Sequence, residues 1–149
     1  MPAYEFLDHP ADVGFVARGR TLAQLFAHAA RAMLDYGWDL STVRARKKVR
    51  VSVAGHDLES LLYNWLAEIL SRADAENWIF KTVTVNRVTA QGTRHKVQGT
   101  EYQVQGTAAG EPFLRARHRA RTYIKAVTYH QLAVQQTPGG FEATVFLDV

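Results

Sequence analysis

The chain has 149 residues, of which 47% are hydrophobic and 21% charged, and its formal charge is +4. These proportions are typical of a folded globular domain and exclude a largely disordered chain. The lack of cysteine excludes disulfides, thiolate catalysis and cysteine-based metal sites, so a bound metal would need oxygen or imidazole ligands.

No apolar run approaches the roughly 20 residues that cross a bilayer, and the N-terminus lacks the pattern of a signal peptide. Linkers, repeats and low-complexity stretches are also missing from the sequence. We therefore expect one domain over residues 1–149, in a cytoplasmic protein without membrane contact.

The first part of the chain predicts two short strands and an amphipathic helix. Residues 4–7 and 13–18 have the composition of strands, and Pro10 breaks the stretch between them because it cannot donate a ladder hydrogen bond. Thr21 begins a helix with a T-x-x-Q capping box, and the apolar residues that follow fall on one face. Gly37 is predicted to end this helix as a left-handed cap.

A strand and a second helix follow. Val49, Val51 and Val53 alternate with polar residues and predict a half-buried strand. Asp57, with Ser60 three residues later, begins a helix with the strongest apolar periodicity in the chain. Its core face is expected to contain Leu58, Leu61, Leu62, Trp65, Leu66, Ile69 and Leu70.

The second half of the chain is predicted to be mostly strand. Strands are expected over residues 80–90, 96–108, 122–134 and 141–149, with turns at 91–93, 109–112 and 137–140. The inward residues of the last strand are either Phe141, Ala143, Val145 and Leu147 or their alternates. Together the pattern predicts an α+β domain, in which two main helices cover a curved, mostly antiparallel sheet.

Acidic groups near both ends of the chain are candidates for a cation site. Asp8-His9-Pro10-Ala11-Asp12 lies between two strands, where carboxylates can bind a hard cation or cap backbone amides. Asp148 and Val149 offer a side-chain and a terminal carboxylate at the end of an apolar strand. A frayed tail is the alternative for these last residues.

The segment Lys125-Ala126-Val127-Thr128-Tyr129-His130 contains the other candidate groups. Strand alternation places Lys125, Val127 and Tyr129 on one side and His130 on the other. His130 could carry a proton, bind a metal or make a polar contact, and a structural histidine is the commonest outcome. Lys125 could pair with a carboxylate or contact a phosphate.

Basic residues form two clusters, one of Arg44, Arg46, Lys47, Lys48 and Arg50 and one of Arg115, Arg117, Arg119 and Arg121. The segment 115–121 is compatible with a short helix or a strand. If it is extended, its arginines form one row that could follow a phosphate backbone. A solvated face or a protein contact is the more frequent outcome. The sequence contains no nucleotide-binding or hydrolase motif, which disfavours an independent enzyme.

Four segments, in this order and spacing, resemble the archease family: Tyr4 to Gly14 with the sequence YEFLDHPADVG, Asp57 to Leu66 with DLESLLYNWL, Lys125 to His130 with KAVTYH, and the final Leu147-Asp148-Val149. Together they span the chain from the first predicted strand to the last residue. The sequence departs from the family pattern at Pro10, Gln131 and Val149, where threonine, glycine and isoleucine are usual. None of these departures removes a carboxylate.

The resemblance implies an accessory protein and not a free-standing enzyme. Archeases promote the guanylylation and repeated turnover of the GTP-dependent RNA ligase that joins tRNA halves. The resemblance also implies a divalent-cation site, occupied by calcium in the family, at Asp12, Asp148 and the terminal carboxylate of Val149; magnesium and manganese are the alternatives. His9, Lys125 and His130 are candidates for the functional surface. An RNA-binding module acting through its arginines and a metal-dependent hydrolase are the other function classes considered.

Overall fold

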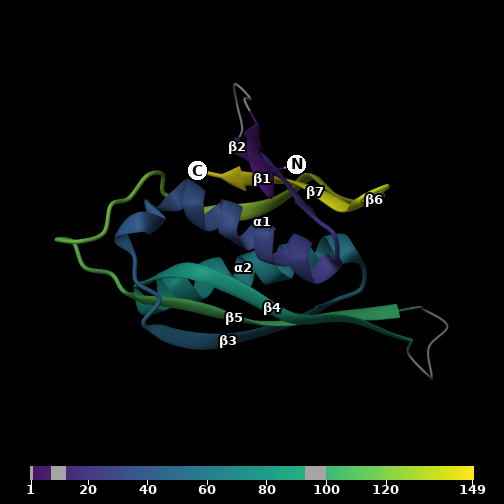
Figure 1. Ribbon diagram of the computed structural model, residues 1–149, viewed down its shortest axis with the longest axis horizontal. Helices are drawn as coiled ribbons and strands as arrows, with labels where there is room; N and C mark the ends of the chain where they lie inside the picture. The colour runs from purple at the N-terminus through teal and green to yellow at the C-terminus, as the bar shows by residue number, and fades with distance from the viewer. Residues whose placement is uncertain (1, 8–12, 93–99) are drawn as a thin grey trace.

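The computed structural model describes residues 2–7, 13–92 and 100–149, which form two β-sheets with a layer of helices between them (Figure 1). Every strand pairing among these residues is antiparallel. The predicted α+β class with two main helices is confirmed. The elements of the described residues, in chain order, are β1 (Tyr4–Leu7), β2 (Val13–Gly19), α1 (Leu22–Gly37), a 3-10 helix (Leu40–Thr42), β3 (Lys47–Gly55), α2 (Leu58–Glu76), β4 (Trp78–Gly92), β5 (Thr100–Pro112), β6 (Ala126–Thr137) and β7 (Gly140–Asp148).

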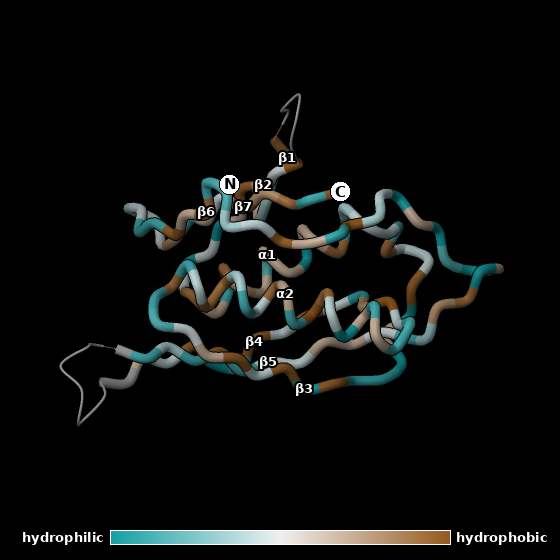
Figure 2. Tube along the Cα trace, turned by 180° about the vertical axis from the view of Figure 1, so that it is seen from behind, coloured by the Kyte–Doolittle hydropathy of each residue, from teal (hydrophilic) through white to brown (hydrophobic). Residues whose placement is uncertain are grey.

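The helices contact both sheets. α1 packs against β2 of one sheet and β4 of the other, and α2 packs against β3 and β6. Figure 2, which views the molecule from behind, shows the same order of layers. Apolar side chains from both sheets therefore meet on the helices, and the outer face of each sheet is left without a helix. No helix in the described part of the chain combines the length and apolar character needed to cross a membrane.

The two sheets have the strand orders β1-β2-β7-β6 and β3-β5-β4. The first sheet joins strands from opposite ends of the chain, because β2 pairs with β7 from Val13 opposite Leu147 to Gly19 opposite Phe141. The N and C labels of Figure 1 accordingly lie close to this sheet.

Trp65 of α2 occupies the centre of the core. Its side chain is fully buried, and its indole N–H donates a hydrogen bond of 3.1 Å to the Phe26 carbonyl oxygen of α1. The one polar atom of the ring is therefore satisfied inside an apolar core. On β7 the buried inward residues are Ala143, Val145 and Leu147, as in the first of the two predicted sets, while Phe141 is half-buried.

The start of α1 follows the prediction with one difference. The Thr21 hydroxyl oxygen accepts the backbone N–H of Gln24 at 3.1 Å, as an N-cap should. The Gln24 side chain accepts the N–H of Arg20 at 2.7 Å, one residue earlier than a capping box requires. The helix start is therefore stabilised by two contacts, and the second one uses the N–H of Arg20 where a capping box would use that of Thr21.

The end of α1 differs from the prediction. Gly37 belongs to the helix, and the cap is Trp38 in an extended conformation. A side chain at Gly37 would contact Ile124, so this glycine serves the packing of a later segment and not a left-handed turn. The left-handed cap occurs on α2 instead, at Asn77 with φ of 54°.

The turn predicted at residues 109–112 was wrong, because these residues continue β5. Glu111 pairs with Ile79 and Gly110 with Phe80. Gly110 is needed for close approach, since a side chain there would overlap the Ile79 carbonyl group. The turn at 137–140 is confirmed by the pairing of Thr137 with Gly140, and the turn at 91–93 extends outside the described residues. β6 begins at Ala126, four residues later than predicted.

We expect Gly106→Ala to destabilise the fold by about 1–3 kcal/mol. Gly106 of β5 lies under Trp65, and an added methyl group would lie 2.7 Å from Trp65 Cη2 and would overlap the Thr84 carbonyl oxygen. Gly139→Ala is the matched control, because no atom lies within 4 Å of the added carbon. Urea unfolding should show a lower midpoint for Gly106→Ala alone, and equal midpoints would contradict this packing.

Candidate functional site at the joined chain ends

The end of β7 is an ordered strand that carries exposed carboxylates. Leu147 is 3% exposed, whereas Asp148 and Val149 are exposed. Asp148 pairs with Ala126 of β6, and its carbonyl oxygen accepts the Lys125 backbone N–H at 2.7 Å. These contacts hold the strand to Asp148 and disfavour the frayed-tail alternative.

Two predicted site residues, His9 and Asp12, lie outside the described residues. Val13 follows Asp12 in the sequence and pairs with Leu147, which precedes Asp148. Each member of this described pair is therefore the covalent neighbour of a predicted ligand. Within residues 2–7, 13–92 and 100–149, no group of three or more histidine, aspartate or glutamate side chains could hold a metal. The cation site therefore stays a prediction.

The described donors at this place fit a hard cation in their chemistry. Asp148 supplies carboxylate oxygens, and the terminal carboxylate follows one residue later. Among the described residues, no basic side chain forms an ion pair with Asp148. Oxygen donors of this kind suit calcium, magnesium or manganese better than softer metals.

Lys125 lies just before β6 and not inside a strand as predicted. Its side chain is exposed and lines an open depression together with Tyr63 and Asp74 of α2. Val127, two residues later, is 4% exposed and faces the core. The predicted alternation is therefore confirmed for Val127, which faces the core. Lys125 is exposed and available to a partner.

A large β-bulge follows, in which the register between β6 and β7 shifts between Thr128 and Ala133. The bulge turns Tyr129 onto Tyr63 of α2, with parallel rings whose centroids are 4.1 Å apart. His130 turns the other way and meets Phe146 edge to face, with centroids 5.7 Å apart. The two rings thus lie on opposite sides of the strand, as the alternation predicted.

Gln131 adopts a left-handed conformation in this bulge, with φ of 53°. This is the position at which the sequence departs from the glycine frequent in the family that it resembles. A left-handed backbone costs a residue with a Cβ roughly 1–2 kcal/mol and costs glycine little. The bulge gives the physical reason for glycine at this position. Sequence reasoning noted the departure but did not predict the bulge.

The segment of α2 that resembles the family makes contacts that stabilise the fold. A Glu59 carboxylate oxygen accepts the Val134 N–H of β6 at 3.0 Å. The Asn64 amide donates to the Ala54 carbonyl of β3 at 2.8 Å. Together with the Tyr63 stack, these contacts connect α2 to both sheets and fix the position of the bulge.

The predicted row of arginines does not form. Residues 115–117 make a turn, and Arg117 pairs with the buried Glu111 at 3.2 Å. Arg121 pairs with Asp35 of α1 at 2.8 Å. The alternation fails because tertiary ion pairs, and not a strand, orient these side chains.

The cause of this turn is a buried pair that sequence reasoning missed. Glu111 is 1% exposed, and one of its oxygens lies 2.9 Å from His118 Nε2. The Leu114 N–H donates to His118 Nδ1 at 2.9 Å, so the partners place the ring proton on Nε2, which donates to Glu111. The His118 ring also packs against the Phe113 ring. No spacing signal in the sequence connects these residues.

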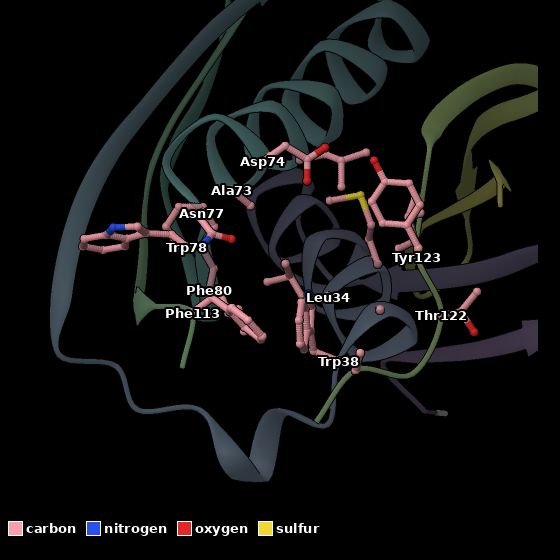
Figure 3. A pocket seen from close by; sticks show the side chains of 16 residues that line it. Leu34, Trp38, Ala73, Asp74, Asn77, Trp78, Phe80, Phe113, Thr122 and Tyr123 are labelled. Atoms are coloured by element: carbon pink, nitrogen blue, oxygen red, sulfur yellow. The ribbon is translucent and has the colours of Figure 1, made fainter. Parts of the chain in front are cut away.

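An apolar cavity of about 280 Å³ lies between the C-terminal ends of the two helices (Figure 3). Its walls include Leu34, Trp38 and Phe113, and Asp74 and Asn77 are polar groups of its lining. Of the predicted site residues that the structure describes, Lys125, His130, Asp148 and Val149, none lines this cavity. Its described lining pairs no serine, cysteine or lysine with a histidine, so these residues do not define a catalytic centre.

We expect Glu111→Gln to reduce the loss of stability in acid. The hydrogen bond from His118, followed by the Arg44 N–H and the Arg117 charge, lowers the pKa of the Glu111 carboxyl group from its usual 4.5. A lowered pKa in the folded state gives stability that is present above pH 4.5 and is lost as the pH falls through the folded value.

The measurement is urea unfolding between neutral pH and pH 3. Glu111→Gln should be less stable than the native chain at neutral pH, and its stability should fall less steeply in acid. Glu76→Gln, at the exposed end of α2, is the matched control and should leave the profile unchanged. A native acid profile in Glu111→Gln would remove the buried pair as its cause.

Fold and site together define a small two-sheet α+β protein whose exposed carboxylates lie where its ends join, with no catalytic constellation in the described residues. A model of the Archease protein family (MTH1598/TM1083) matches residues 4–149. The chain belongs to this family.

Curated relatives agree with that membership. The protein archease of Methanothermobacter thermautotrophicus is 36% identical over 149 residues, and that of Sulfolobus acidocaldarius is 32% identical over 153; each alignment covers all of both chains. The solution structure of Methanobacterium thermoautotrophicum protein 1598 has a TM-score of 0.78 and 36% identity, with both chains fully covered. An archease of Thermotoga maritima, described as a possible chaperone, has a TM-score of 0.55 at 16% identity over 96% of this chain and 94% of that one, and supports the fold alone.

Proposed function

We propose that this chain is a metal-binding accessory protein that activates a GTP-dependent tRNA-splicing RNA ligase. It promotes guanylylation of the ligase and its repeated turnover, and it acts in the cytoplasm. The observation that carries the proposal is family membership over residues 4–149, with the exposed carboxylates of β7 at the position where the family pattern has its cation ligands.

The proposed cation is calcium, with magnesium or manganese as alternatives, held by Asp12, Asp148 and the terminal carboxylate of Val149. A divalent ion there would offset two of the three negative charges, which otherwise repel one another. Its chemical contribution would be electrostatic: Asp12, Asp148 and the terminal carboxylate would be held together for docking, or the bound ion would face the nucleotide site of the ligase. His9, Lys125 and His130 are the proposed contact surface of the partner.

The second candidate, an RNA-binding module acting through the arginines of 115–121, loses its main support. Two of the four arginines, Arg117 and Arg121, are engaged by Glu111 and Asp35. A metal-dependent hydrolase is also disfavoured, because the sequence contains no hydrolase motif.

The activity test is ligase guanylylation followed over several turnovers, with and without this protein. We expect no RNA joining by the protein alone and a clear increase in repeated turnover by the ligase of the same host. Lys125→Ala should lower the stimulation while leaving unfolding unchanged, because the side chain is exposed. Arg20→Ala, which removes an exposed basic side chain just before α1, is the matched control. A ligase that gains nothing from the native protein would refute the proposal.

The cation test compares native protein with a form whose terminal carboxylate is blocked as an amide. Calcium titration calorimetry should show a loss of affinity of at least about tenfold on amidation, because one oxygen ligand becomes neutral. An N-terminal tag should leave the affinity unchanged. Unfolding gives an independent readout, since calcium at 100 times its Kd should stabilise the native form by about 2.7 kcal/mol. Equal affinity in both forms would remove Val149 from the site.

A further inference from the structure

No helix of the described residues covers the outer face of the β3-β5-β4 sheet (Figures 1 and 2). The inner face of this sheet packs on α1 and α2 through Val49, Val51 and Val104. The side chains that alternate with the inner ones therefore point away from the core. On β3 these alternate residues, Lys48, Arg50, Ser52 and Ala54, are all exposed.

Pairing between the strands shows what shares this face. Arg50 lies opposite Thr107 of β5, which lies opposite Thr84 of β4. The next row joins Ser52, Gln105 and Arg87 in the same way. We call the surface made by Lys48, Arg50, Ser52, Thr84, Arg87, Gln105 and Thr107 the basic sheet face.

Positive charge dominates this surface. Lys48 and Arg50 are two residues apart on β3, or about 7 Å, and Arg87 is two strands away, or about 10 Å across the sheet. None of these three cations forms an ion pair within the described residues. Among the described residues of the three strands, the exposed acidic side chain on this side is Glu101, four residues from Gln105 on β5, or about 13 Å along the strand. Further positive charge lies next to these three cations, on exposed residues at and just before the start of β3: Arg44, Arg46 and Lys47.

The chemistry between the cations favours phosphate over protein as the partner. Threonine hydroxyl and glutamine amide groups, which donate hydrogen bonds, separate the charges. The basic sheet face contains no aromatic or large aliphatic side chain, whereas protein interfaces depend on such anchors. It also lacks the stacking platforms by which single strands are bound.

We propose that the basic sheet face binds the phosphate backbone of duplex RNA, without reading its sequence. Lys48, Arg50 and Arg87 contact phosphates, and the Thr107 hydroxyl and the Gln105 amide donate to phosphate or ribose oxygens. This site is separate from the joined chain ends, which lie in the other sheet. The inference goes beyond the proposed function and does not depend on it, since its test contains neither ligase nor divalent cation.

The test is fluorescence anisotropy with two labelled RNA duplexes of unrelated sequence, titrated with full-length protein in chelator. Each phosphate contact on a duplex contributes a slope of about −0.9 in log affinity against log salt. Three contacts thus predict a loss of affinity of about 40-fold between 50 and 200 mM salt, and a variant with Lys48→Gln and Arg50→Gln should lose only about fourfold. The two duplexes should bind equally.

The matched control carries Arg115→Gln and Arg119→Gln, which remove the same net charge from exposed positions elsewhere. It should keep the native salt dependence, and Arg87→Gln, from the opposite edge of the face, should weaken binding. All variants change exposed side chains, so their thermal midpoints should match the native one. Equal losses in the variant and its control would show that net charge alone attracts RNA and would overturn the site. Displacement of the RNA by polyglutamate at matched charge would overturn the choice of RNA as the partner.

Discussion

Pairing of β2 with β7 is the constraint on which the rest of this protein depends. It places the beginning and the end of the chain in one sheet, through a register that runs from Val13 opposite Leu147 to Gly19 opposite Phe141. The same pairing buries Phe15 and Val145 against α1, so the register is fixed by the core and not only by backbone hydrogen bonds. A slip by one residue would turn these apolar side chains outward. Exposure of Asp148 is a direct result of this register.

The arrangement of layers separates stability from function. Both helices are covered by sheets on two sides, and three polar groups of α2 are already engaged: Trp65 with α1, Glu59 with β6 and Asn64 with β3. Groups available to partners therefore lie on the outer faces of the sheets and at strand ends. The acidic end of β7 and the basic outer face of β3-β5-β4 belong to different sheets. Two partners of opposite charge could thus bind without competing for the same surface.

Sequence alone predicted the elements whose pattern repeats locally. The periodic apolar residues and the Asp57 cap predicted α2, and alternation in 49–53 predicted β3. The failures share a cause in contacts distant along the chain. Gly37 and Gly110 were taken as turn glycines, but each allows a close approach, to Ile124 and to the Ile79 carbonyl.

The candidate site likewise has features that a local sequence pattern predicted and features that it could not predict. The opposite directions of Tyr129 and His130 were predicted from strand alternation, whereas the inward set of the last strand, and with it the exposure of Asp148, was left open between two alternatives. The bulge that gives Gln131 its left-handed backbone, and the Glu111–His118 pair that turns the arginine segment, could not be predicted because both are set by tertiary packing. The contributions of His9 and Asp12 rest on the resemblance, since these residues lie outside the described ranges.

The central claim is that one cation joins the two ends of the chain. A double-mutant cycle in calcium affinity tests it most directly, with Asp12→Ala, Asp148→Asn and the double variant measured by calorimetry under identical conditions. If both carboxylates bind the same ion, each single change removes most of the affinity, and the double variant binds little more weakly than either single one. Losses that simply add, or undiminished affinity in Asp12→Ala, would contradict the claim that these two ends share a cation.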